Sequence, residues 1–155
     1  MMNTGITPGT LESPSSLGHG SSCRHSVQFY YDDSFLIHSI CDFLAAALSS
    51  GRPAIVVATR EHRFDCAECI REKGIDLSRA IEEGRYIALD ASETLDQFMI
   101  HGTPNAQRFE QVIGDIIASS SSAAKCQGKN AEAKVAIFGE MVALLLQRGE
   151  NQAAL

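Results

Sequence analysis

The chain has 155 residues, of which 45% are hydrophobic and 21% are charged. This length and composition are typical of one globular domain with its own core. The formal charge of -6 disfavours a nucleic-acid phosphate backbone as a direct partner, and no basic cluster offsets it.

Membrane and secretory segments are not expected. Apolar stretches such as Ala54–Ala58 and Met141–Leu146 are far shorter than the roughly 20 residues of a membrane span. The N-terminus lacks the basic region and apolar core of a secretory signal. Five cysteines without regular spacing indicate reduced thiols rather than disulfides. We therefore expect a cytoplasmic protein without direct membrane contact.

Structure is expected to begin after a polar tail. Residues 1–24 are rich in Gly, Ser, Thr and Pro and are predicted to be disordered. Val27–Tyr30 is short, alternating and β-prone, so it is predicted as a strand. Asp32 and Asp33 offer N-cap chemistry for a helix that is expected to close at Gly51.

The middle of the chain alternates between short apolar strands and helices. The continuous run Ala54–Ala58 is typical of a strand that is buried on both faces of a parallel sheet. A helix capped by Thr59 is predicted to follow and to stop at Gly74. A shorter helix is predicted over Leu77–Glu83, and Tyr86–Leu89 is predicted as the third strand.

The last third of the chain continues this alternation. Ser92–Met99 is predicted as a helix capped by its first residue, and a second helix is expected to restart at Thr103–Asn105. Residues 119–133 are polar and low in complexity, so they are predicted as an internal loop. Val135–Phe138 is predicted as the fourth strand, and Met141–Gln147 as a helix.

Strands that alternate with helices require crossover connections. The predicted fold class is therefore α/β, with three layers and a mostly parallel central sheet that carries helices on both faces. Ligands in such folds bind outside the carboxyl ends of the strands. The candidate ligand-binding residues that the sequence places there are Tyr30, Tyr31, Asp32, Asp33, His62, Arg63, Asp90 and Glu140.

Four motifs stand out in order along the chain. They are His25–Asp33, Ala54–Thr59 with Glu61-His62-Arg63, Arg85–Ala91 with Glu93-Thr94-Leu95, and Val135–Leu145 with Phe138–Val142. Together they resemble the MEDS family, the sensory domain named for methanogen and methylotroph regulators, over about residues 25–155.

The resemblance implies a RecA-like fold that derives from P-loop ATPases but has no functional P-loop. It also implies a signal-input role in front of a histidine kinase or a transcription regulator, with small organic compounds as signals. Tyr31 departs from the family pattern, in which an acidic residue often follows the position of Tyr30. Family members usually continue beyond the position of Leu155, so the chain is expected to be either a free-standing domain or a fragment.

The residues after the first predicted strand lie where a P-loop would bind phosphate. Tyr30–Ser34 contains neither glycine nor lysine, and it places Asp32 and Asp33 near the expected phosphate position. Because carboxylates repel phosphate, no ATP hydrolysis and no cofactor are expected. The aspartates could contact a ligand or simply cap a helix. Tyr30 and Tyr31 could stack on a ligand, or one of them could lie in the core.

The remaining candidates also have structural alternatives. His62 and Arg63 could hold an anionic ligand, contact one of the two aspartates, or form a solvated first helical turn. Glu140 could face the same pocket or be an exposed acid. Asp90 could bind a ligand or cap the helix that follows it.

Cys66 and Cys69 form a C-x-x-C motif and share one helical face with His62. These residues could bind zinc only with a fourth ligand, and a redox pair would more usually lie at a helix N-terminus. Ordinary helix packing and no metal site are therefore predicted. No pairing pattern is visible for the other cysteines, Cys23, Cys41 and Cys126.

The expected function is a non-catalytic sensory domain. It would bind a small organic ligand at the carboxyl edge of the sheet and signal to a kinase or transcription-regulator output, or act through a homodimer. The alternative is a protein-interaction module with a vestigial nucleotide site that acts on a kinase or an anti-sigma-type partner. An enzyme would require Asp32, Glu140 and His62 to converge at metal-ligand distance.

Overall fold

The structure, a computed structural model, describes residues 32–126 and 134–154. The expected tail 1–24, the expected strand Val27–Tyr30 and the end of the expected loop lie outside these residues. In chain order the elements are α1 (Asp33–Ser49), β1 (Ala54–Ala58), α2 (Arg60–Glu72), α3 (Leu77–Glu82), β2 (Tyr86–Asp90), α4 (Ala91–Phe98), β3 (Met99–Ile100), β4 (Thr103–Pro104), α5 (Ala106–Cys126), β5 (Ala136–Gly139) and α6 (Met141–Gln147).

Three parallel strands in the order β2-β1-β5 form the central sheet. In its register, Ile55 of β1 lies beside Ile87 of β2 and Ile137 of β5. All five residues of Ala54–Ala58 are buried, as the continuous apolar run predicts. The α/β class with a parallel sheet is therefore confirmed for the described part of the chain.

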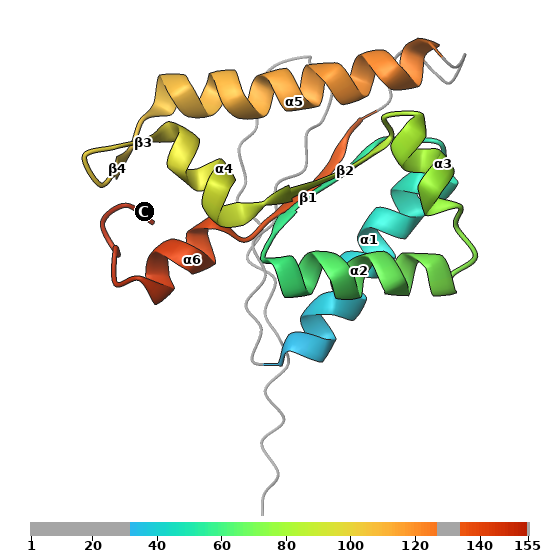
Figure 1. The fold of residues 1–155 in the computed structure, drawn as a ribbon, viewed down its shortest axis with the longest axis horizontal. Helices are drawn as coiled ribbons and strands as arrows, with labels where there is room; N and C mark the ends of the chain where they lie inside the picture. The colour runs from blue at the N-terminus through green and yellow to red at the C-terminus, as the bar shows by residue number, and fades with distance from the viewer. Residues whose placement is uncertain (1–31, 127–133, 155) are drawn as a thin grey trace, which may run out of the picture.

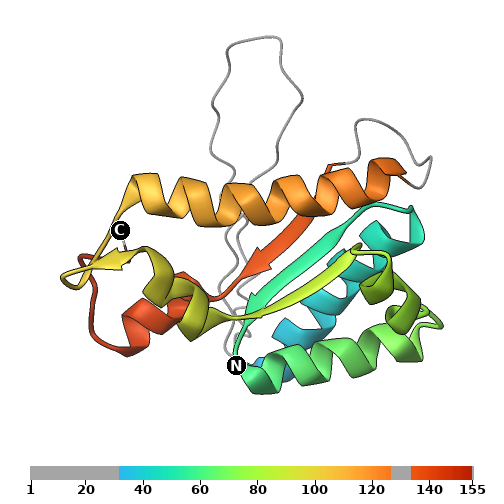
Figure 2. The same ribbon diagram turned by 45° about the horizontal axis from the view of Figure 1, so that its top comes forward.

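Helices cover both faces of this sheet (Figures 1 and 2). Val56 and Ala58 pack with α1, α2 and α3 in one apolar cluster. Ile55 and Val57 pack on the opposite face, where α4, α5 and α6 contribute side chains. Because successive side chains of a strand point to opposite faces, one unbroken apolar run serves both clusters.

The predicted loop over 119–133 is wrong as far as residue 126, because α5 continues to Cys126. Small side chains let this helix lie close to the sheet. Ser120 is buried, and a Cβ atom added at Gly84 would come within 3.1 Å of the Cβ of Ala123. Ser119 donates its hydroxyl to the carbonyl oxygen of Asp115, which satisfies that hydroxyl within the helix.

Helix caps explain where three of the helices begin. Asp32 accepts from the backbone N–H of Phe35 at 3.0 Å and caps α1, and Thr59 caps α2, as expected. The predicted cap Ser92 is wrong, because Asp90 caps α4, which confirms the capping alternative for Asp90. The Asp90 carboxylate accepts from the backbone N–H groups of Ser92 and Glu93, so the cap lies two residues earlier than predicted.

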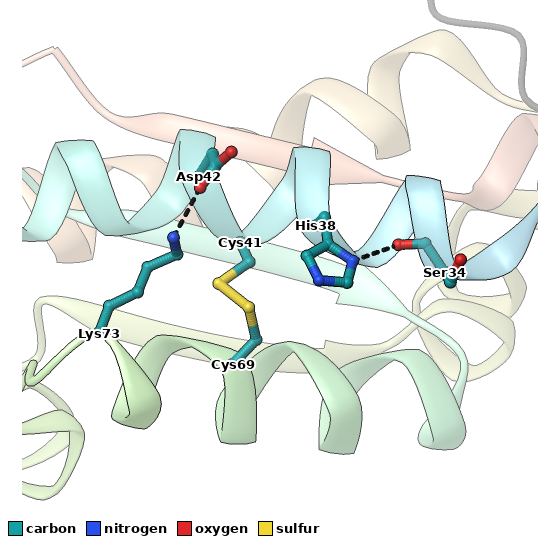
Figure 3. Close-up of a disulfide and its surroundings, with 6 residues drawn as sticks. All are labelled: Ser34, His38, Cys41, Asp42, Cys69 and Lys73. Carbon is teal, nitrogen blue, oxygen red and sulfur yellow. Dashed lines mark hydrogen bonds and ion pairs between the residues drawn. A yellow bond between two sulfur atoms is a disulfide. The ribbon is translucent and has the colours of Figure 1, made fainter.

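The expectation of unpaired, reduced thiols is wrong for Cys41 and Cys69, which form a disulfide between α1 and α2 (Figure 3). Their Cα atoms are 6.1 Å apart, although the residues are 28 positions apart in sequence. The C-x-x-C motif suggests a pairing of Cys66 with Cys69, but Cys69 instead pairs with Cys41 of the neighbouring helix α1. Cys66 is free and buried.

Candidate functional site

The carboxyl ends of β1 and β5 lead to helices on opposite faces of the sheet. β1 continues into α2, whereas β5 continues into α6 on the other side. Such a divergence opens a crevice at the strand ends, which is where open α/β sheets bind ligands. A cavity of about 300 Å³ lies there, lined by Asp33, Thr59, Glu61, His62, Glu140, Ala143, Leu144 and Gln147.

Glu140 is the buried polar residue of this cavity, at 5% exposure. Its Oε2 atom accepts from the backbone N–H of Thr59 at 2.8 Å, and its Oε1 atom contacts Nδ1 of His62. Its own backbone N–H donates to the carbonyl oxygen of Val57 at 2.9 Å. Two donors therefore hold a carboxylate that would otherwise be costly to bury.

Glu140 also occupies the N-cap position of α6, but its side chain makes no cap hydrogen bond there. The carboxylate instead crosses from the end of β5 to the beginning of α2. The contact ties the first turns of α2 and α6 together across the crevice.

A second polar pair lies on the other side of β1. Nη2 of Arg63 donates to Oδ2 of Asp90 at 2.8 Å, and Oδ1 of Asp90 caps α4. Both side chains are about one quarter exposed. The pair joins the first turn of α2 to the end of β2 and is not part of the cavity lining.

The structure separates the sequence-predicted candidates into groups. Asp33, His62 and Glu140 line the cavity. Asp32 serves as the cap of α1, and its hydrogen bonds from Ser34 and Phe35 hold the pKa of its carboxyl below the usual value. Tyr30 and Tyr31 lie outside the described residues, so their role stays a prediction.

Both basic candidates have acidic partners, although not the expected ones. The alternatives for His62 and Arg63 were an anionic ligand, a contact with Asp32 or Asp33, and a solvated first helical turn. The structure pairs His62 with Glu140 and Arg63 with Asp90. These pairs depend on how α2 lies against the ends of β5 and β2, which the local sequence does not specify.

Sequence analysis missed several lining residues on α2 and α6. Glu61 lies beside His62 in the first turn of α2. Ala143, Leu144 and Gln147 follow Glu140 by three, four and seven positions. That helical spacing places them on one face of α6, so the signal was present once Glu140 was a candidate.

The charge of the cavity is mostly negative. Asp33, Glu61 and Glu140 contribute three carboxylates, and His62 contributes one imidazole. This balance disfavours anions and favours neutral polar or cationic ligands. Within residues 32–126 and 134–154, no group of three or more His, Cys, Asp or Glu side chains could hold a metal ion.

A larger hollow of about 560 Å³ lies between α4 and α5. Its lining includes Gln97, Arg108, Gln111 and Asp115, whose side chains are exposed to solvent. It is a surface groove between helices and lies away from the strand ends. The smaller cavity at the strand ends is the better candidate because a buried, hydrogen-bonded carboxylate forms part of its wall.

Comparison with known proteins gives one match. The family model described as MEDS, MEthanogen/methylotroph, DcmR Sensory domain, matches residues 24–155. No curated protein and no solved structure matches this chain. Among the described helices, none combines the length and apolar character that crossing a membrane requires.

Proposed function

Because the chain belongs to the MEDS family of sensory domains, we propose that it binds a small organic ligand in the cavity between the ends of β1 and β5. The observation that carries this proposal is the cavity of about 300 Å³ at the point where β1 and β5 diverge, with Glu140 buried in its wall. This volume lies at the lower end of the range for small-molecule sites. The ligand is accordingly small.

The contacts of the cavity wall support a sensory role. A ligand there touches the first turns of both α2 and α6, which Glu140 already links. Its binding free energy can therefore shift the balance between two arrangements of these helices. The output is a histidine kinase or a transcription regulator in the cytoplasm, either on the same chain or as a separate partner.

A thermal-shift screen tests the proposal. The purified chain is screened against alkyl amines, alcohols and carboxylates of matched size, and against Mg-ATP and ADP. A ligand at about 100 times its Kd adds roughly 2.7 kcal/mol, which raises the Tm by several degrees. We expect a shift with amines or alcohols and none with carboxylates. A shift with Mg-ATP would show that nucleotide binding persists.

A cavity-filling variant locates the site. Ala143→Phe places an aromatic ring in the cavity wall and is expected to abolish the ligand-induced shift. Ala118→Phe makes the same change at an exposed position of α5 and should retain the shift. Binding that survives in Ala143→Phe would place the ligand elsewhere.

A protein-interaction module remains the second candidate function. Three phenylalanines of α1 and α2 are largely exposed: Phe35 at 51%, Phe43 at 49% and Phe64 at 65%. Exposed aromatic side chains are frequent in protein interfaces. If no compound shifts the Tm, and Phe43→Ser or Phe64→Ser weakens binding to a kinase or anti-sigma-type partner in calorimetry, this candidate replaces the first.

A further inference from the structure

Three cysteines gather where α1 packs against α2. Cys41 and Cys69 form the disulfide (Figure 3). Cys66 lies three positions, about one helical turn, before Cys69 in α2. All three belong to the apolar cluster on this face of the sheet. Cys41 and Cys66 are fully buried, whereas Cys69 is partly exposed.

The disulfide joins the two helices whose first turns line the cavity. α1 and α2 run in the same direction, and both begin at the carboxyl edge of the sheet (Figures 2 and 3). Cys41 follows the lining residue Asp33 by eight positions, and Cys69 follows His62 by seven. At 1.5 Å per residue, the link lies about 12 Å along α1 and about 10 Å along α2 from the cavity.

No comparably strong link joins these helices elsewhere in the described structure. Lys73 and Asp42 form an ion pair of 2.7 Å beside the disulfide, with side chains that are 41% and 70% exposed. Exposed ion pairs contribute little to holding two elements together. Among the described residues the disulfide is therefore the one covalent link between α1 and α2, which also pack through the apolar cluster.

We propose that the Cys41–Cys69 disulfide is a redox-responsive link that a dithiol reductant opens, and that opening it loosens the wall that the first turns of α1 and α2 contribute to the cavity at the strand ends. The inference rests on the proposed function, because the cavity is the site that it regulates. The domain can remain folded in both states, since reduced cysteines pack as small apolar side chains. In a reducing compartment, protein disulfides are typically transient and redox-sensing rather than permanent.

The exchange reaction balances with the dithiol as sole reductant. One thiolate of the dithiol attacks Sγ of the partly exposed Cys69, forms a mixed disulfide and releases the sulfur of Cys41. The second thiol of the dithiol then attacks the dithiol sulfur that is bonded to Cys69 in the mixed disulfide, and Cys69 is released as a thiolate. Two electrons pass to the protein, Cys41 and Cys69 each take up one proton, and the reductant leaves as its internal disulfide.

Cys66 is unsuited to interfere with this exchange. Burial raises the pKa of its thiol to about 11, so it remains protonated near neutral pH. Because the thiolate is the attacking species, Cys66 does not exchange with the Cys41–Cys69 disulfide. It therefore provides a matched control in the same helix.

Amide hydrogen exchange on the unliganded full chain tests the link. Mass spectrometry under non-reducing conditions should first identify a cross-linked peptide pair that contains Cys41 and Cys69. The amide of Thr59 donates to the carboxylate of Glu140, and the amide of His62 donates to the hydroxyl oxygen of Thr59. After reduction with dithiothreitol, we expect both amides to exchange at least tenfold faster. The absence of the cross-link, or exchange at these amides that reduction leaves unchanged, would overturn the proposal.

Two variants separate the link from a general effect of reductant. Cys69→Ala should exchange rapidly at Thr59 and His62 whether or not reductant is present. Cys66→Ala should retain both the cross-link and the response to reduction. A response lost in Cys66→Ala, or unaffected in Cys69→Ala, would contradict the assignment.

The redox inference can fail independently of the proposed function. Its exchange assay contains no ligand, and the thermal-shift screen uses the oxidised chain. If reduction speeds amide exchange but no compound raises the Tm, the redox link is supported and the proposed ligand binding is contradicted. A ligand shift combined with unchanged exchange overturns the link alone.

Discussion

Glu140 is the residue on which the geometry of the cavity most depends. Glu140→Gln preserves its size but replaces one of the two acceptor oxygens by an NH2 donor, so the side chain no longer accepts from both the N–H of Thr59 and Nδ1 of His62. A buried donor without a partner costs about 1–3 kcal/mol. We therefore expect the free energy of unfolding, measured by urea denaturation, to fall by about that amount.

Glu61→Gln provides the matched control for this substitution. Glu61 lines the same cavity but is exposed, so the same chemical change should alter the free energy of unfolding by less than about 0.5 kcal/mol. Equal effects at the two positions would mean that the hydrogen bonds of Glu140 do not stabilise the fold.

Single residues were predictable where a local pattern decides their role. Asp32 precedes a helical apolar stripe, so its capping role follows from neighbouring residues alone. Glu140 was a candidate because it follows a strand. Its partners were not predictable, because His62 is 78 positions away and meets it only through the packing of α2 and α6 across the sheet end.

At the scale of elements, Asp90 connects two helices through two different interactions. It caps α4 and pairs with Arg63 of α2. Asp90→Asn retains a cap acceptor but removes the charge, so we expect a loss of about 0.5–1 kcal/mol. Asp90→Ala removes both interactions and should cost roughly a further 1 kcal/mol in denaturant unfolding.

Asp76, the cap of α3, calibrates this comparison. Its carboxylate accepts from the N–H of Arg79 at 2.9 Å. Asp76→Asn should be nearly neutral, and Asp76→Ala should lose about 1 kcal/mol. If Asp90→Asn is as neutral as Asp76→Asn, the pair between Arg63 and Asp90 contributes nothing to stability.

Elements with a distinctive apolar pattern were predicted correctly, and those that depend on close packing between distant segments were not. The apolar run of β1 identified a buried strand. The serine-rich end of α5 was predicted as loop, because its composition resembles one and the sequence does not reveal that small residues are needed beside Gly84. The β3–β4 hairpin was not predicted, and its turn residues His101 and Gly102 have the positive φ angles that close it.

At the scale of the whole molecule, the alternation of strands and helices predicted a parallel sheet with helices on both faces. It did not predict the strand order β2-β1-β5, which depends on which face each crossover covers. The disulfide was missed for the same reason. Cys41 and Cys69 become neighbours only because α1 and α2 lie side by side on one face.

The disulfide should also change the global stability, chiefly through the unfolded state. Cross-linking residues 28 positions apart restricts the unfolded chain, and the loop-entropy relation gives a stabilisation of about 3.5 kcal/mol. Reduction should therefore lower the free energy of unfolding by about that amount in guanidinium denaturation. The slope of the transition should rise, because the reduced unfolded chain exposes more surface.

Cys69→Ala should unfold like the reduced protein with or without reductant, after allowance for the small loss of side-chain packing. Cys66→Ala should preserve the difference between the oxidised and reduced forms. Since single domains are stable by about 5–15 kcal/mol, the reduced chain should stay folded while losing a substantial share of its stability. Oxidised and reduced proteins of equal stability would mean that the bond does not restrict the unfolded chain as the loop-entropy relation expects, whereas its effect on the native cavity is measured by the hydrogen exchange of Thr59 and His62.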